Sequence, residues 1–343
     1  MPPARLLIVL LGAIGDVVCA MPLARRLRAA WPSTQITWAV EPPAAPLLEA
    51  HPAVDRVIVF RRGEGAGAFS EFLRAVRRSR PDVTLDCQRH FKSGLTSWYS
   101  GAPRRLGFHW QNSREGNRLF NNAAIAPVRE FTPKLTHFLR FADALGIAPA
   151  PISFGLVSGA AEREAVRPLL DQAGPRFAVL YVGSSWASKQ WLPRPTAALC
   201  RQLRARGLAV VLLGAAADAP FAQRVLAAGA GEVVDAVGRA SLREAVAVLE
   251  RATIAIGPDS GPMHIAAAVG VPVVALFGAT NPARSGPWGW HHFVVRGDAA
   301  CAPCYLSRCP IGQLCMERIA PEMVMQRVEE VLAGTAVPQE WYG

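Results

Sequence analysis

The chain lacks the features that would assign it to several common classes. Its 343 residues contain no apolar run of the roughly 18–20 residues that a membrane-spanning helix needs. No repeat with a period of about 20–50 residues and no low-complexity segment is present. Aromatic residues make up 8% of the chain and rarely lie among the basic ones, and no nucleic-acid-binding module is recognisable. We therefore expect no nucleic-acid partner.

A convincing signal peptide is also missing. The apolar residues 6–14 have the length of a signal-peptide core, but no convincing cleavage site follows them. They lead into Gly15-Asp16 and a basic amphipathic segment, which predicts a first β-strand instead. We therefore expect a cytoplasmic protein, in which the seven cysteines would not form structural disulfides.

Positive charge is in excess, and it is unevenly distributed. The net charge is +11, and residues 1–150 hold 20 Lys and Arg against 11 Asp and Glu, while the remainder holds 17 against 15. A basic first half suggests an acidic partner, such as anionic lipid headgroups or an acidic sugar. A merely solubilising surface is the alternative.

Apolar runs alternate with helical patterns in two successive series, which predicts an α/β protein with two doubly wound halves. The proline-rich residues 148–153 separate the halves, and residues 100–135 are rich in loops. The helix after Asp16 should bend or start late, because Pro22 falls inside it. Strands are expected at residues 5–11, 36–40, 54–60, 83–86, 177–182, 209–213, 252–256 and 271–277. The expected domains are 1–152 and 153–320, followed by a helix and tail, 321–343, that could pack back on the first domain.

Unusual polar residues follow several of these strands. They are Gly15-Asp16 and residues 88–93 in the first half, and residues 183–189 and 257–264 in the second. Ligands of doubly wound sheets lie at the carboxyl ends of the strands. A cleft between the halves is the simplest way to bring these four segments together.

Residues 252–280 read as a strand, a small-residue helix and a second strand. Glycines stand where strand passes to helix or loop, so backbone N–H groups and a helix N-terminus can face an anion. Asp259, Ser260 and His264 project into the same mouth, although a lone histidine is more often structural. A phosphate-bearing small molecule is the expected ligand.

Asp16 admits three interpretations. Gly12-Ala-Ile-Gly15-Asp16 could be a dinucleotide loop with Glu41 on the ribose, although the full G-x-G-x-x-G pattern is absent. Alternatively, the Asp16 carboxylate at a helix N-terminus could accept a proton from a hydroxyl group. A plain helix N-cap is the third interpretation.

Two further groups of residues could bind anions. Lys189, with Ser184 and Ser185 before it, could clamp a diphosphate and stabilise the charge of a leaving phosphate without a metal, or could be a solvated loop lysine. Basic residues in the first half suit an anionic sugar or lipid and form a candidate floor: Arg61, Arg62, Lys92, Arg114 and Arg140.

Four cysteines fall within one 15-residue segment near the end of the chain. Cys301, Cys304, Cys309 and Cys315 could form a tetrahedral zinc or iron site, although their spacing is tighter than the usual pair of pairs. Reduced thiols are the alternative.

Taken together, these motifs resemble those of glycosyltransferase family 9, the ADP-heptose:lipopolysaccharide heptosyltransferases. The resemblance covers nearly the whole chain. It rests on Gly15-Asp16, Asp86-Cys-Gln88 with Lys92-Ser93, Gly183-Ser-Ser with Lys189-Gln-Trp-Leu-Pro193, Gly238 before Ser241-Leu242, Asp259-Ser-Gly-Pro-Met-His264, Phe277-Gly-Ala-Thr280 and the cysteine-containing tail.

The resemblance implies a GT-B fold, in which two Rossmann-like domains face a central cleft, the first binding the acceptor and the second the nucleotide sugar. It implies inverting transfer of heptose from ADP-L-glycero-D-manno-heptose to a Kdo or heptose of the lipopolysaccharide inner core. No cofactor is required. The enzyme would work at the cytosolic face of the inner membrane, associated peripherally with an anionic surface and with the acidic lipid A and core acceptor.

The resemblance also implies roles for individual residues. Asp16 would be the catalytic base, and Lys189 would act in catalysis and donor binding. The other donor-binding residues would be Ser184, Ser185, Gly238, Asp259, Ser260, Gly261, His264, Gly278 and Thr280, and the acceptor-binding residues Arg61, Arg62, Gln88, Lys92, Arg114 and Arg140. Ala216-Ala217 depart from the family, because many members have an acidic residue for the ribose there and only Asp218 is near.

Two other functions are compatible with parts of the sequence. The loop around Gly12 with Glu41 is compatible with an NAD-dependent oxidoreductase. A non-catalytic anion-binding protein would keep the same fold and phosphate loops.

Overall fold

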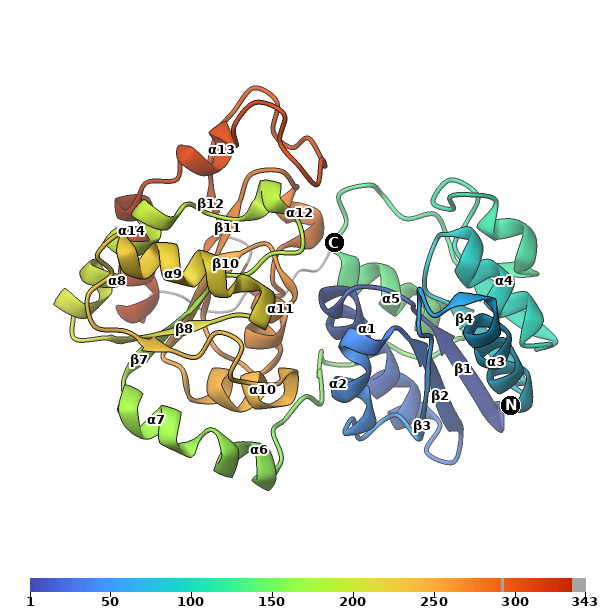
Figure 1. The fold of residues 1–343 in the computed structure, drawn as a ribbon. Coiled ribbons are helices and arrows are strands. Elements are labelled where there is room, and N and C mark those ends of the chain that lie inside the picture. Colours follow the sequence, from blue (N-terminus) through green and yellow to red (C-terminus); the bar gives the residue numbers. More distant parts are fainter. Residues whose placement is uncertain (291–292, 335–343) are drawn as a thin grey trace. The chain divides into compact units, whose positions relative to one another are not determined.

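The chain forms two compact units, Met1–Leu156 and Val157–Gly343, in a computed structural model that describes residues 1–290 and 293–334. Each unit has a six-stranded sheet in which all paired strands are parallel. Helices cover both faces of each sheet (Figure 1). The predicted α/β class with two doubly wound units is therefore confirmed.

The sheet of the first unit has the strand order β3-β2-β1-β4-β5-β6. The central strands consist mostly of apolar residues and are almost fully buried, as expected for parallel strands that are covered on both faces. The strands are β1 (Arg5–Val9), β2 (Gln35–Val40), β3 (Arg56–Val59), β4 (Val83–Asp86), β5 (Arg104–Gly107) and β6 (Ala123–Ala124).

Helices pack on both faces of this sheet. On one face Leu7 and Val9 contact Phe72 and Val76 in a buried cluster, and elsewhere in the unit two long helices pack against each other. Phe72 and Val76 belong to α3. The two long helices that pack against each other are α1 and α5. The helices are α1 (Ile14–Ala30), η1 (Pro42–Ala44), α2 (Ala45–Glu49), α3 (Gly65–Arg78), α4 (Phe91–Tyr99), η2 (Asn117–Phe120) and α5 (Lys134–Ala144).

Helix α1 continues through Pro22, contrary to the predicted late start. It begins at Ile14, and its residues from Val17 to Ala24, Pro22 included, are buried. Proline removes one backbone hydrogen bond in the interior of a helix. Burial of the apolar residues on either side offsets that loss.

The sheet of the second unit has the order β12-β11-β10-β7-β8-β9. Counted within the unit, this repeats the order of the first sheet. The strands are β7 (Phe177–Tyr181), β8 (Ala209–Leu213), β9 (Val234–Asp235), β10 (Ile254–Pro258), β11 (Val273–Phe277) and β12 (Val295–Arg296).

The final helix of the second unit, α14 (Pro321–Leu332), packs on α8, β11 and β12. Its expected contact with the first unit stays a prediction, and residues 335–343 of the predicted tail lie outside the described residues. The other helices are α6 (Ala160–Ala165), α7 (Arg167–Ala173), η3 (Ala187–Lys189), α8 (Pro193–Ala205), η4 (Ala216–Asp218), α9 (Ala219–Ala227), α10 (Leu242–Arg251), α11 (Gly261–Ala268), α12 (Pro282–Ser285) and α13 (Leu314–Glu317).

The strand order fixes where ligands can bind in each unit. The chain reverses its direction of winding between β1 and β4 in the first sheet, and between β7 and β10 in the second. Ligands of open α/β sheets bind at such switch points, outside the carboxyl ends of the strands. All four polar segments singled out in the sequence follow one of these four strands. Within the described residues, no helix has the length and apolar content needed to cross a membrane.

Candidate functional site

A lysine and a buried aspartate meet at the switch point of the second sheet. Lys189 ends η3 after β7, and Asp259 directly follows β10. The Lys189 ammonium lies 2.7 Å from Asp259 Oδ2, and the two side chains are 15% and 7% exposed. The same ammonium lies 4.4 Å from the centre of the Trp186 ring. The carboxylate and the ring together hold the positive charge in place.

The N-terminus of α11 follows Asp259 immediately. Ser260 is the N-cap residue, but its side chain does not cap the helix. Its Oγ is buried and hydrogen-bonds to no atom of the described residues. Gly261 and His264 lie in the first helical turn, and His264 is buried. An unsatisfied hydroxyl at the positive end of a helix is suited to an anion.

The loop after β11 completes the surroundings of Asp259. Thr280 Oγ1 donates a 2.6 Å hydrogen bond to Asp259 Oδ2, the oxygen that also contacts Lys189. A Cβ atom at Gly278 would lie 2.5 Å from Cys315 Sγ, so close packing excludes a side chain there. Lys189, Asp259 and Thr280, which the sequence places in three separate segments, are thus in direct contact.

The remaining predicted donor residues border the ends of β7 and β8. Ser184 Oγ accepts a 3.3 Å hydrogen bond from the Trp186 N–H, and Ser185 is exposed. Gly238 has a φ of +71°, and a Cβ atom there would lie 2.9 Å from Ala216 Cα. Only glycine combines this conformation with so close an approach.

Asp218 is the acidic residue next to Ala216-Ala217. A Cβ atom on Gly183 would lie 2.1 Å from the Asp218 carboxylate, which accepts a 2.8 Å hydrogen bond from the Ala215 N–H. Burial raises the pKa of this carboxyl group. Asp218 is therefore the acidic side chain that the fold brings to the ends of β7 and β8.

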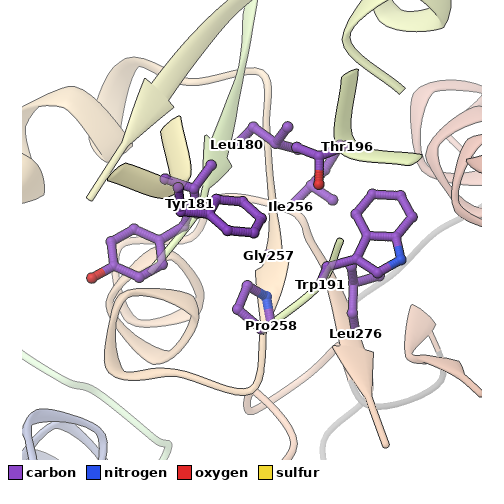
Figure 2. A pocket seen from close by; sticks show the side chains of 10 residues that line it. Leu180, Tyr181, Trp191, Thr196, Ile256, Gly257, Pro258 and Leu276 are labelled. Carbon is purple, nitrogen blue, oxygen red and sulfur yellow. The ribbon is translucent and has the colours of Figure 1, made fainter. Parts of the chain in front are cut away.

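A small cavity in the second unit is not the ligand site. It is lined by apolar residues such as Tyr181, Trp191 and Leu276, and Figure 2 shows their side chains around it. Its volume is about 10 Å³, which is enough for at most one water molecule. Trp191 is buried here and donates a hydrogen bond to the Ile319 carbonyl at 3.2 Å, so it is a structural anchor.

In the first unit, Asp16 forms an ion pair that the sequence did not reveal. It lies in the first turn of α1, and its Oδ1 accepts a hydrogen bond from the ammonium group of Lys134, the first residue of α5. The two side chains are 29% and 28% exposed, so solvent reaches both. Ala13 is the N-cap residue, and the N-cap interpretation of Asp16 is therefore wrong.

Gln88 fixes the loop that leads to Asp16. Its Oε1 accepts a 3.0 Å hydrogen bond from the Leu11 N–H, and its Nε2 donates one of 3.0 Å to the Leu11 carbonyl. The side-chain amide therefore joins the ends of β1 and β4. These contacts give Gln88 a role in positioning the loop, and its predicted contact with the acceptor stays a prediction.

A buried polar network lies behind Gln88. Asp86 is fully buried, and its Oδ2 accepts hydrogen bonds from Asn117 at 2.6 Å and Asn121 at 3.0 Å. Burial raises the pKa of Asp86 to about 6, although hydrogen bonds from Asn121, Asn117, Ser93 and the Gln88 N–H oppose the rise. The carboxyl group ties η2 and α4 to the end of β4.

The structure places the predicted acceptor-binding residues in different surroundings. Arg62 lies 4.0 Å from Glu41, Arg61 lies 3.9 Å from Glu64, and Arg140 lies 3.5 Å from Asp143. These three pairs are largely exposed and add little stability. Lys92 and Arg114 are exposed near the Asp86 network, since Lys92 is on α4 and Arg114 just precedes η2.

The cysteine cluster is not supported as a metal site. Across residues 1–290 and 293–334, no three His, Cys, Asp or Glu side chains are arranged to hold a metal ion. Cys301 is exposed, Cys304 and Cys309 are partly buried, and Cys315 is buried. Burial raises the pKa of the Cys315 thiol. The described residues therefore do not support a structural metal ion, and reduced thiols stay the alternative prediction.

Sequence reasoning missed Lys134, Asn117 and Asn121. All three lie in or next to the stretch that we predicted to be rich in loops. No local pattern marks them, because their partners Asp16 and Asp86 are more than 30 residues away in the chain.

Comparisons with known proteins agree on one family. The model of "Glycosyltransferase family 9 (heptosyltransferase)" matches residues 69–314. Lipopolysaccharide heptosyltransferase 1 of Pseudomonas aeruginosa is 30% identical over 96% of this chain and 98% of its own length. A family 9 glycosyltransferase structure from Veillonella parvula matches with a TM-score of 0.82 at 21% identity, over 96% of this chain and 97% of that one. The Escherichia coli heptosyltransferase WaaC with ADP matches with a TM-score of 0.74 at 24% identity, over 95% and 99%.

Proposed function

The chain belongs to glycosyltransferase family 9 and has the GT-B fold, and we propose that it transfers a heptose from ADP-L-glycero-D-manno-heptose to the lipopolysaccharide inner core. Family membership makes it a transferase, which removes the oxidoreductase alternative. The observation that carries the donor assignment is the contact of Lys189 with Asp259 beside the N-terminus of α11. The names of the relatives support the heptose and the acceptor.

The second unit would hold the diphosphate of the donor. A cation, an unsatisfied Ser260 hydroxyl and the first N–H groups of α11 supply hydrogen-bond donors of the kind that phosphate oxygens accept. In the proposed complex the Lys189 ammonium turns from Asp259 toward the phosphates. Asp218 would accept a hydrogen bond from a ribose hydroxyl, in place of the acidic residue absent at Ala216-Ala217.

Asp16 would be the general base of a single displacement. The acceptor hydroxyl attacks the anomeric carbon of the heptose, its proton passes to the Asp16 carboxylate, and the bond from that carbon to the diphosphate breaks, so that ADP leaves and the configuration inverts. Lys134 orients the carboxylate through their ion pair. A positioned base contributes about 10²–10⁴-fold to the rate, and one donor aimed at the leaving charge about 10²–10³-fold.

The first unit would bind the acidic acceptor. Lys92 and Arg114 are exposed and are the proposed contacts to its anionic groups, with Arg61, Arg62 and Arg140 as further candidates. Because the acceptor is a lipid, the proposal places the enzyme at the cytosolic face of the inner membrane. No cofactor enters this reaction scheme.

Release of ADP is the direct test. The purified protein is incubated with ADP-heptose and a panel of truncated cores ending in Kdo or in heptose, and product mass is recorded. We expect one class of core to gain a heptose in step with ADP release. Release of ADP that does not depend on any core would indicate hydrolysis and would contradict the proposed transfer. No turnover with any core would also contradict the proposal and would favour the non-catalytic alternative. In parallel calorimetry, ADP should bind and NADH should not.

A further inference from the structure

Helix α4 has its polarity reversed. Its outward face carries Phe91, Trp98 and Tyr99, which are 48%, 55% and 37% exposed. Phe91 and Trp98 are two helical turns apart and therefore lie on one side, next to Lys92 and Tyr99. A surface helix normally turns its apolar side inward and its polar side to water. An exposed cluster of large apolar side chains marks an interaction site.

The inward face of α4 is made of small and hydroxyl-bearing residues. Ser93, Thr96 and Ser97 are fully buried, and Ser97 Oγ donates a 2.7 Å hydrogen bond to Asn121 Oδ1. Ser100, just after the helix, is 2.9 Å from the Thr84 hydroxyl of β4. Hydrogen bonds hold this face against the sheet, while Trp98 and Tyr99 stay exposed on the other side.

The helix is also fixed at its N-terminus. Glu115 accepts a 3.1 Å hydrogen bond from the Phe91 N–H and lies 3.1 Å from His90 Nδ1. The hydrogen bond from Phe91, followed by that from His90, lowers the pKa of Glu115. Phe91 packs edge to face with Phe120 of η2, with ring centres 5.2 Å apart. These contacts of Glu115 and Phe120 fix the N-terminus of α4, the helix that carries the aromatic face.

The chain segment that carries this face has a net positive charge. Residues 87–122 contain six basic side chains and one acidic one, and the acidic one is Glu115, already engaged at the helix N-terminus. In the same segment, Trp110 is 56% exposed, and the centre of its ring lies 5.8 Å from the guanidinium carbon of Arg118. The basic residues of the segment are Arg89, Lys92, Arg104, Arg105, Arg114 and Arg118.

We infer that the outward face of α4, defined by Phe91, Trp98 and Tyr99, is a membrane-docking surface that inserts into the headgroup boundary of an anionic bilayer. Aromatic side chains with one polar edge prefer this boundary, and a basic amphipathic helix lies in its plane. The net positive charge of residues 87–122 favours a lipid surface over a second copy of this basic chain. The inference rests on the proposed function only in that the acceptor would be a lipid in the same bilayer.

Vesicle sedimentation with the full chain tests the inference. Vesicles of phosphatidylglycerol mixed with phosphatidylethanolamine are compared with phosphatidylcholine vesicles, at low and at high salt. The test variant is Trp98→Ser/Tyr99→Ser, which leaves the proposed substrate residues intact. The matched control is Leu226→Ser, which removes a side chain that is 38% exposed on α9 of the other unit. Circular dichroism verifies that each variant is folded.

We expect the wild type and Leu226→Ser to bind the anionic vesicles and to be released by salt. The double variant should bind at least roughly tenfold more weakly. Equal binding of the double variant, or wild-type binding that does not depend on lipid charge, would overturn the inference. So would a wild-type oligomer that the double variant dissociates, because the face would then join copies of the chain.

Transfer to a water-soluble truncated acceptor separates this inference from the proposed function. We expect the double variant to keep wild-type turnover on that acceptor while losing vesicle binding. Vesicle binding without turnover in the wild type would refute the proposed function and leave the docking surface intact. Turnover in a wild type that does not bind anionic vesicles would support the proposed function and refute the docking surface.

Discussion

Replacing Asp86 with asparagine should remove a specific pH dependence from the stability of the first unit. Asp86 is fully buried at the end of β4, where Asn117 and Asn121 donate hydrogen bonds to it. Burial raises its pKa from the ordinary value of 3.8 to about 6. Asparagine has nearly the same shape but no proton to exchange in this range, so the comparison of the two proteins isolates the carboxyl group.

The sign of the effect follows from proton binding. Between pH 3.8 and about 6 the folded chain keeps a proton on Asp86 that the unfolded chain has released. Stability therefore falls as the pH rises through this window. A difference of about 2 pKa units corresponds to about 3 kcal/mol of unfolding free energy. The unfolding free energy of the wild type, relative to that of Asp86→Asn, should fall by about this amount between pH 4 and pH 7.

The assay must report on the first unit alone. Samples equilibrated in urea at each pH are pulse-labelled by hydrogen exchange at one fixed pH, and peptides that cover β4 and α4 are analysed by mass spectrometry. Asn117→Ala, which removes a hydrogen bond that lowers the pKa of Asp86, should extend the upper end of the window to higher pH. A wild-type stability that runs parallel to that of Asp86→Asn, or rises with pH relative to it, would refute the reasoning.

Further predictions concern the reaction. Asp16→Ala should lower kcat about 10²–10⁴-fold with little change in ADP affinity by calorimetry, and an equal loss of ADP binding would reassign Asp16 to the nucleotide. Lys189→Ala should lower kcat about 10²–10³-fold and should also weaken ADP binding, because it removes the cation beside α11; unchanged affinity would exclude the clamp. Lys134→Met should lower kcat while leaving ADP affinity unchanged, since the ion pair with Asp16 lies in the first unit. Metal analysis of the purified protein should find less than one zinc or iron per chain, and one tightly bound ion lost on Cys315→Ala would contradict that expectation.

The sequence was sufficient for the central strands and for the loops that follow them. Continuous apolar runs such as Phe177–Tyr181 and Val273–Phe277 are typical of strands buried on both faces, and ligands of such sheets bind where the strands end. The motifs around Lys189 and Asp259 therefore pointed to one site before any contact was known.

The sequence was insufficient between residues 87 and 135. Helix α4 and strands β5 and β6 were not predicted, because α4 turns serine and threonine inward and aromatic residues outward. Period and polarity normally agree in a surface helix, and here the polarity is reversed. The two short strands carry too few residues for a pattern.

The amino-acid sequence by itself determined the alternation of strands and helices, the division into two units and the family, because apolar period and local motifs are written in consecutive residues. Only the tertiary structure decided that Gln88 holds Leu11, that Lys134 pairs with Asp16 and that Asp86 is buried in an amide network. Such pairs join residues from distant parts of the chain, and the free energy that selects them comes from burial and hydrogen bonding that exist only after the sheet has formed.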